Sequence, residues 1–148
     1  MTSYLIDINV WLAMTWDLHP HHDRASRWYV SAGNSALLFC RFTTLGFLRL
    51  LTHDKVMGDS TATLSEALKL YDQWIADPRV DLAPEPRQTG KLFREALDPI
   101  ALRPATKAIG DGYLIGFAVA AGARLVTFDK GLAGMARAQR APVTLLQP

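Results

Sequence analysis

The sequence predicts an α/β domain of three layers, in which helices cover both faces of a central, mostly parallel sheet. Short apolar runs alternate with longer stretches of helical periodicity, which is the pattern of β-α units with parallel strands. A chain of 148 residues, 49% of them hydrophobic, has the size and apolar content of one domain. The predicted strands are 4–6, 36–40, 80–83, 125–128 and 143–146.

Helical spacing of apolar residues follows the first strand. Val10, Trp11 and Met14 predict a short helix over 10–15, and a second helix with an alanine and aromatic face is expected over 25–32. The polar segment between them, 17–23, contains three histidines. A solvated helix start is favoured there over a zinc site, because neither a cysteine nor a fourth histidine lies near in the sequence.

The middle of the chain contains three further helices. Residues 41–44 turn the chain into a helix over 45–52, in which Leu45, Leu48 and Leu51 are expected to face inward. Ser60 is a suitable N-cap for a long helix that ends before Pro78. Prolines bound the next strand and precede a helix over 88–97. The following stretch, 98–106, has weak periodicity and is expected to form a loop that borders the site.

The segment 110–129 combines a helix with a strand. Asp111, Leu114, Ile115 and Ala118 recur on one helical face, so Asp111 begins an otherwise apolar stripe. Gly122 is expected to end this helix, and Asp129 follows the next strand directly. A short helix over 130–138 precedes the last strand.

Three aspartates are predicted to meet at one edge of the sheet. Asp7 and Asp129 each follow a strand, ligands bind beyond the carboxyl ends of parallel strands, and Asp111 can join them from the adjoining helix. Carboxylates that lie close together repel one another unless a cation neutralises them, and Mg²⁺ prefers such oxygen ligands. Each residue alone also has a plainer explanation: Asp7 as a helix cap, Asp111 as a partner of the helix dipole, Asp129 as a turn residue.

Composition sets bounds on the partners and the compartment. A net charge of +2 and a pI near 8.9 permit nucleic acid as a partner without requiring it. One cysteine, Cys40, excludes an internal disulfide, and its apolar neighbours indicate a buried thiol. We expect no membrane span and no signal peptide, and therefore a cytoplasmic protein in a reducing compartment.

Taken together, the motifs resemble the PIN domain, and within that family the VapC-type toxins of bacterial type II toxin–antitoxin systems. The resemblance covers nearly the whole chain, as a single PIN-like domain over residues 1–148. The segments that carry it are, in order, YLIDINVWLA, HPHHDRASRWY, TTLGFLRLLT, VDLAPEP and AIGDGYLIGFAVAAGARLVTFDKGL.

The resemblance implies a metal-dependent endoribonuclease, a hydrolase that cuts RNA and is silenced by a cognate antitoxin, usually as a homodimer. Asp7, Asp111 and Asp129 match the family's catalytic acids and would hold Mg²⁺ or Mn²⁺, which activates a water for attack on the phosphodiester. Asn9 and Thr127 match supporting positions. Three cations, Arg41, Arg49 and Lys130, are expected to hold the RNA backbone by phosphate contact.

The chain departs from the family pattern at one acid. The family usually has a glutamate at or just after the second strand, but no Asp or Glu occurs between Asp23 and Asp54, and Thr43, Thr44 or Gly46 stands there. Whether the site holds one metal ion or two, and whether activity is retained, therefore stays open.

Two other functions fit parts of the sequence. A haloacid-dehalogenase-like phosphatase needs a general acid two residues after its first aspartate, where this chain has Asn9. A non-catalytic module of the PIN-like fold that binds RNA or a protein would explain the missing glutamate.

Overall fold

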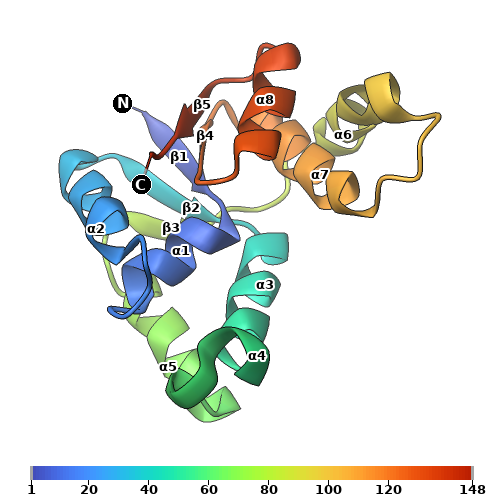
Figure 1. Ribbon diagram of the computed structural model, residues 1–148. Helices are drawn as coiled ribbons and strands as arrows, with labels where there is room; N and C mark the ends of the chain where they lie inside the picture. Colours follow the sequence, from blue (N-terminus) through green and yellow to red (C-terminus); the bar gives the residue numbers. More distant parts are fainter. Residues whose placement is uncertain (1, 148) are drawn as a thin grey trace.

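The computed structural model describes residues 2–147, and its centre is a sheet of five strands (Figure 1). The strands are β1 (Ser3–Ile6), β2 (Ala36–Phe39), β3 (Val80–Leu82), β4 (Arg124–Thr127) and β5 (Val143–Leu145). They lie in the order β3-β2-β1-β4-β5 and every pair is parallel. The predicted three-layer α/β/α class is confirmed, and the described sheet is parallel throughout.

Helices connect the strands and cover both faces. They are α1 (Ile8–Thr15), α2 (His22–Ser31), α3 (Arg41–Leu51), α4 (Asp54–Met57), α5 (Leu64–Ile75), α6 (Thr89–Leu97), α7 (Thr106–Ala121) and α8 (Lys130–Ala138). Two short 3-10 turns, η1 (Gly58–Ser60) and η2 (Asp98–Ile100), follow α4 and α6. None of the helices within residues 2–147 is long and apolar enough to cross a membrane.

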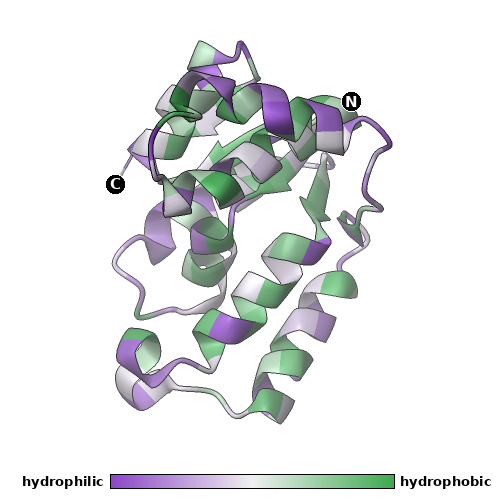
Figure 2. Cartoon of the chain, turned by 90° about the vertical axis from the view of Figure 1, so that its right-hand side faces the viewer, coloured by the Kyte–Doolittle hydropathy of each residue, from purple (hydrophilic) through white to green (hydrophobic). Residues whose placement is uncertain are grey.

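The alternation of side chains along the strands creates two cores. Ile6, Phe39 and Val126 pack with α1, α2, α3 and α5 on one face of the sheet. Leu5 and Leu125 point to the other face and pack with α6, α7 and α8. Figure 2 shows the consequence, because the strands are mostly green whereas the helices alternate between green and purple. Strands buried on both faces are typical of parallel sheets.

Several helices begin at different residues from those predicted, and capping explains the starts of α3 and α5. Helix α3 begins at Arg41, four residues early, because Thr43 Oγ1 accepts a hydrogen bond from the Cys40 backbone N–H (2.9 Å) and caps the helix. Thr63, rather than Ser60, caps α5 in a reciprocal pair with Glu66. Local capping partners decided both boundaries.

The observed helix boundaries change two expectations, one for the buried side chains of α3 and one for the position of Asp111 in α7. The earlier start of α3 leaves Leu45 exposed, while Phe47 is buried. Helix α7 begins at Thr106, which places Asp111 in its second turn instead of at its start. The residues that precede Asp111 are therefore helical and share its faces.

The strand order contains a reversal beside β1. The chain adds β2 and β3 on one side of β1 and then returns to add β4 and β5 on the other. Helix α1 follows β1 and packs on one face of the sheet, whereas α8 follows β4 and packs on the other. This arrangement opens a crevice at the carboxyl ends of the two strands. Asp7 follows β1 and Asp129 lies two residues after β4.

An ion pair ties the turn between α5 and β3 to α2. Asp77 accepts hydrogen bonds from Arg79 Nη2 (3.0 Å) and from the Tyr29 hydroxyl (2.5 Å), and the Arg79 guanidinium lies 4.2 Å from the centre of the Tyr29 ring. The hydrogen bond from Arg79, with that from Tyr29, lowers the pKa of Asp77 to about 2. This group is far from the crevice and titrates independently of it.

A glycine permits the close packing of α6 on α7. A Cβ atom added at Gly116 would lie 2.6 Å from the backbone nitrogen of Phe93, and backbone atoms cannot move aside cheaply. We predict that Gly116→Ala lowers the free energy of unfolding by about 2 kcal/mol or more, as expected for overpacking.

Gly134 in α8 has open space around it, so Gly134→Ala should raise stability by about 0.5–1 kcal/mol through helix propensity. Urea unfolding of both variants provides the measurement; equal effects would contradict the packing argument.

Candidate active site

The crevice at the strand reversal contains a hollow of about 330 Å³. Its acidic lining is Asp7, Asp111 and Asp129, which come from the ends of β1 and β4 and from α7. The other lining residues come from the start of α1 and from α3 and α7: Ile8, Asn9, Phe42, Gly46, Arg49, Leu50, Lys107, Gly110 and Leu114. The three predicted acids therefore meet at one site.

Asp7 is the most buried of the three acids. Its Oδ1 accepts from the backbone N–H of Ile8 (2.8 Å) and caps α1, and its Oδ2 accepts from Thr127 Oγ1 (2.6 Å). Burial raises the pKa of Asp7 to about 6, although these hydrogen bonds lower it; the charges of Asp111 and Asp129 add to the rise. Asp7 is thus both a helix cap and a member of the acid cluster.

Asp129 has a different electrostatic environment. Its Oδ1 caps α8 by accepting from the backbone N–H groups of Gly131 (2.8 Å) and Leu132 (3.1 Å), and its Oδ2 accepts from Lys107 Nζ (2.5 Å). Partial burial raises the pKa of Asp129, but the hydrogen bond and charge of Lys107 and the two amides outweigh this and lower it. Asp129 is the acid that stays ionised most readily.

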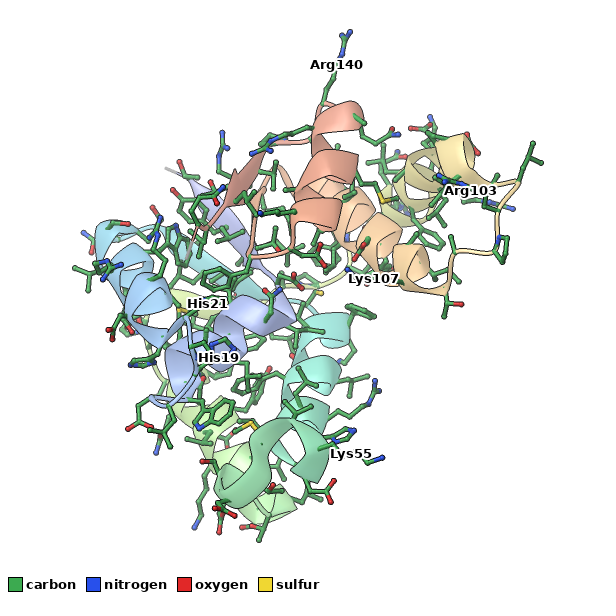
Figure 3. The ribbon with its side chains drawn as sticks, viewed as in Figure 1. His19, His21, Lys55, Arg103, Lys107 and Arg140 are labelled. Atoms are coloured by element: carbon green, nitrogen blue, oxygen red, sulfur yellow. The ribbon has the colours of Figure 1, made fainter. Side chains whose placement is uncertain are left out.

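Lys107 is the functional candidate that the sequence analysis missed. It lies one helical turn before Asp111 on α7, and Figure 3 shows it in the space between α7 and the starts of α1 and α3. The hydrogen bond to Asp129 raises its pKa, and the charges of the three acids add to this. The spacing of four residues from Asp111 was the available signal, but the predicted helix began too late to use it.

Asp111 has the least compensation. Burial, followed by the charge of Asp129, raises its pKa, while Lys107 lowers it only in part. Asn9 adds a further oxygen, because its Oδ1 is buried with no hydrogen-bond partner among the described residues. The side chains of Asp111 and Asn9 both line the hollow, and their oxygens are free to bind a cation.

The remaining predicted residues divide between the hollow and its surroundings. Thr127 lies beneath the acids, where it donates to Asp7 and accepts from the Asp129 backbone N–H (2.9 Å). Arg49 lines the hollow, whereas Arg41 lines a neighbouring one and Lys130 lines neither.

The stretch 98–106 does not line the hollow, contrary to expectation. Ile100, Ala101, Arg103 and Ala105 line a separate depression next to α6. In Figure 3, Arg103 accordingly lies near α6 and away from Lys107.

The position of the missing acid is now definable. Thr43 caps α3 and Thr44 donates to the Tyr71 hydroxyl (3.2 Å), so both side chains are buried in packing. Gly46 lines the hollow instead. A Cβ atom there would lie 2.2 Å from Ile8 Cδ1, so the isoleucine side chain occupies the space beside Gly46.

The histidine-rich segment serves local packing. His21 donates its backbone N–H to His19 Nδ1 (3.0 Å), and its ring stacks on Phe128 at 4.9 Å. His22 Nδ1 pairs with the Ala13 carbonyl (2.7 Å). These contacts join the segment between α1 and α2 to the loop that carries Asp129.

The hollow offers the chemistry of a hard-cation site without a preassembled set of ligands. Within residues 2–147, no three Asp, Glu, His or Cys side chains already lie close enough to hold an ion together. The Lys107 ammonium supplies the positive charge near Asp129. The unpaired Asn9 oxygen and the two carboxyls of raised pKa are nevertheless oxygen donors that a divalent cation would stabilise. The residues therefore fit a metal ion that displaces Lys107.

Comparison with known protein families identifies the family to which this chain belongs. The model of the PIN domain matches residues 4–138. The chain belongs to the PIN-domain family. Membership decides against the haloacid-dehalogenase alternative, as does Asn9 at the position where that chemistry needs an acid.

Relatives within the PIN family are VapC ribonucleases. The chain is 37% identical to Ribonuclease VapC41 of Mycobacterium tuberculosis over 131 residues, which cover 84% of this chain and 88% of the relative. It is 30% identical to Ribonuclease VapC38 of the same species over 148 residues, with 96% of each chain covered.

Solved structures share the PIN fold at low sequence identity. VapBC2 from Rickettsia felis, bound to a DNA fragment from its promoter, superposes with a TM-score of 0.69 and 13% identity, covering 99% of this chain and 100% of that one. VapC20 of M. tuberculosis, a toxin that cleaves the sarcin–ricin loop, gives a TM-score of 0.64 and 14% identity over 89% and 94%. The resemblance expected from the sequence is confirmed.

The raised pKa of Asp7 makes the stability of the metal-free PIN domain depend on pH. Between about pH 4 and pH 6 the folded protein keeps a proton on Asp7 that the unfolded chain releases, so stability falls as the pH rises through this window. We predict that wild type loses about 2–3 kcal/mol more across it than Asp7→Asn does, because Asp111, whose pKa is also raised, contributes in both proteins. Urea unfolding in EDTA at several pH values measures this.

Asp77→Asn is the matched control of opposite sign. The lowered pKa of Asp77 contributes stability above about pH 4 that is lost as the pH falls toward 2, so this variant should flatten the acid limb alone. Identical pH profiles for wild type and Asp7→Asn would show that Asp7 titrates normally.

Proposed function

We propose that the protein is a metal-dependent endoribonuclease, the toxin component of a VapBC-type toxin–antitoxin pair. The observation that carries the proposal is the convergence of Asp7, Asp111 and Asp129 at the strand reversal of a PIN domain. The names of the relatives VapC41 and VapC38, both ribonucleases, support RNA as the substrate. The reaction class is hydrolysis of a phosphodiester bond.

Each acid has a distinct part in this proposal. Asp129, held ionised by the α8 amides, would hold the cation in place of Lys107, and Asp7 and Asp111 would complete the anionic surface. Asn9 would offer its unpaired oxygen as a further ligand, and Thr127 positions Asp7. A bound Mg²⁺ or Mn²⁺ lowers the pKa of a coordinated water and shields the phosphate charge. No side-chain nucleophile is required.

The cations around the hollow are the proposed RNA contacts. Arg49 lines the hollow itself, and Lys107 becomes free to contact phosphate once Asp129 has another cation. Arg41 borders the adjoining hollow, and Lys130 begins α8 beside Asp129. Phosphate contacts of this kind position a strand without reading its sequence.

The proposal includes partners outside the described chain. A cognate antitoxin that covers the site and a homodimer both follow from the VapC resemblance, and both stay predictions. A cytoplasmic location likewise stays a prediction.

One observation favours a second function. The ammonium of Lys107 already neutralises Asp129, and Ile8 fills the space beside Gly46, where the family resemblance implies a further acid. A non-catalytic PIN-like module that binds RNA or a protein would need no more than this. Dependence on Mn²⁺ separates the two functions.

We predict that Asp7→Asn abolishes RNA cleavage without unfolding the protein. The substitution removes an anionic ligand but keeps the side-chain volume and the ability to cap α1. Cleavage of a labelled RNA with MnCl₂ and with EDTA, together with thermal melting of the same samples, measures both properties.

Asp98→Asn is the matched control. Asp98 begins η2, and the acid hollow does not include it, so this variant should cleave at the rate of wild type. Undiminished, Mn²⁺-independent cleavage by folded Asp7→Asn would sink the assignment, and wild type that binds RNA without cutting it would favour the non-catalytic module.

The contact between Lys107 and Asp129 predicts competition between the ammonium and a metal ion. Lys107→Met should tighten Mn²⁺ binding by about tenfold, because the ion no longer displaces a cation from Asp129; such a factor corresponds to about 1.4 kcal/mol. Calorimetric titration of the free protein measures the affinity.

Lys130→Met removes a neighbouring cation that forms no ion pair with the acids and does not line the hollow, and it should change the Mn²⁺ affinity far less. A Lys107→Met affinity equal to that of wild type, or weaker, would exclude competition.

A further inference from the structure

An exposed aromatic ring stands at the rim of the acid hollow. Phe42 lies in the first turn of α3 and lines the hollow, yet its side chain is 40% exposed and belongs to neither core. Its ring is available to a ligand that occupies the hollow.

The ring is held in place by neighbours on α7. Gly110 leaves room for it, since a Cβ atom there would lie 2.9 Å from Phe42 Cζ. The ring of Tyr113 lies 5.7 Å away at an interplanar angle of 49°, and the Tyr113 hydroxyl donates to Glu85 Oε1 (2.6 Å). Phe42 is therefore supported from one side and open on another.

A second hollow of about 330 Å³ lies beyond the Phe42–Tyr113 pair. Its walls are apolar and aromatic, from Leu82, Pro84, Tyr113 and Phe117, and Arg41 borders it. The two hollows adjoin across the aromatic pair. An anionic group in the first can therefore be covalently joined to an apolar group near the second.

The geometry points to a stacking subsite in which Phe42, supported by Tyr113 and bordered by Arg41, holds an unpaired nucleobase next to the scissile phosphate. This inference rests on the proposed ribonuclease function and requires the base that occupies the subsite to be unpaired. Bases within a duplex are stacked on one another, so they cannot lie on a protein ring unless the strand is open.

Charge determines which part of the RNA occupies each hollow. Lys107 and Arg49 lie at the acid hollow, where a phosphate would bind. Within the second hollow a phosphate would be attracted by Arg41 at its border but repelled by the Glu85 carboxylate, whereas the amino group of a base can donate a hydrogen bond to Glu85. The base, rather than the backbone, is the better occupant of the aromatic side.

Phe42→Leu tests the stacking role separately from packing. Leucine keeps an apolar side chain against Gly110 but has no π-face, while Phe42→Trp keeps the π-face. Leu45→Ala is the matched control, because Leu45 is 51% exposed on the same helix and lines neither hollow. All variants are made in the Asp7→Asn background so that the probe is not cut, and thermal melting confirms that they fold.

Two fluorescent probes distinguish base from backbone contacts. One is a single-stranded RNA of about twelve nucleotides and mixed sequence, and the other is an abasic ribose-phosphate strand of the same length. We expect Phe42→Leu to weaken binding of the RNA by about 5- to 30-fold in anisotropy titrations, as for the loss of one stacked base. Binding of the abasic strand should not change, and Phe42→Trp and Leu45→Ala should behave like the background protein.

The outcomes separate the subsite from the proposed function. If Phe42→Leu binds both probes as the background does, or weakens both equally, the stacking subsite is overturned while RNA binding stands. If no variant binds RNA, including the background protein, the proposed ribonuclease function is overturned together with the subsite.

Discussion

The site depends on a short chain of hydrogen bonds that joins the two strands at the reversal of the sheet. Thr127 donates to Asp7 and accepts from the backbone N–H of Asp129, so one buried hydroxyl connects the end of β1 to the loop after β4. The Asp7 backbone N–H also donates to the Val126 carbonyl (2.9 Å), which continues the parallel ladder to its last residue. Because α1 and α8 start from these same two aspartates, the hydrogen bonds that cap the helices also orient the acids.

The same residues therefore satisfy structural and chemical requirements that oppose each other. Caps favour ionised aspartates, whereas burial and mutual repulsion favour protonated ones. The protein resolves this unequally, since the pKa of Asp129 is lowered by Lys107 and the α8 amides while burial raises the pKa of Asp7 and of Asp111. Lys107 acts as an internal counter-ion on a flexible, 73% exposed side chain, which a stronger cation can displace.

The surroundings of the acids differ in polarity from one side of the site to the other. Carboxylates and cations occupy one hollow, and an aromatic pair separates it from a second, more apolar one. Gly46 and Gly110 are both needed for this arrangement, because one makes room for Ile8 and the other for Phe42. Beside Gly46, where the family resemblance implies an acid, the space is therefore filled by an apolar side chain.

The sequence by itself determined the class of the fold, the strands and the three acids. These follow from local signals, namely apolar runs, helical periodicity and aspartates placed directly after strands. It also located Asn9, Thr127 and Arg49, which the structure places at the hollow or directly beneath it. Only the tertiary structure decided that Lys107 and Phe42 belong to the site, that Gly46 rather than Thr43 or Thr44 faces the acids, and that Arg41 borders a different hollow. The physical reason is that the start of a helix depends on its cap. Helices α3 and α7 each begin four or more residues before the predicted start. The earlier starts change which side chains of their first turns lie near the ends of β1 and β4, which are distant in the sequence.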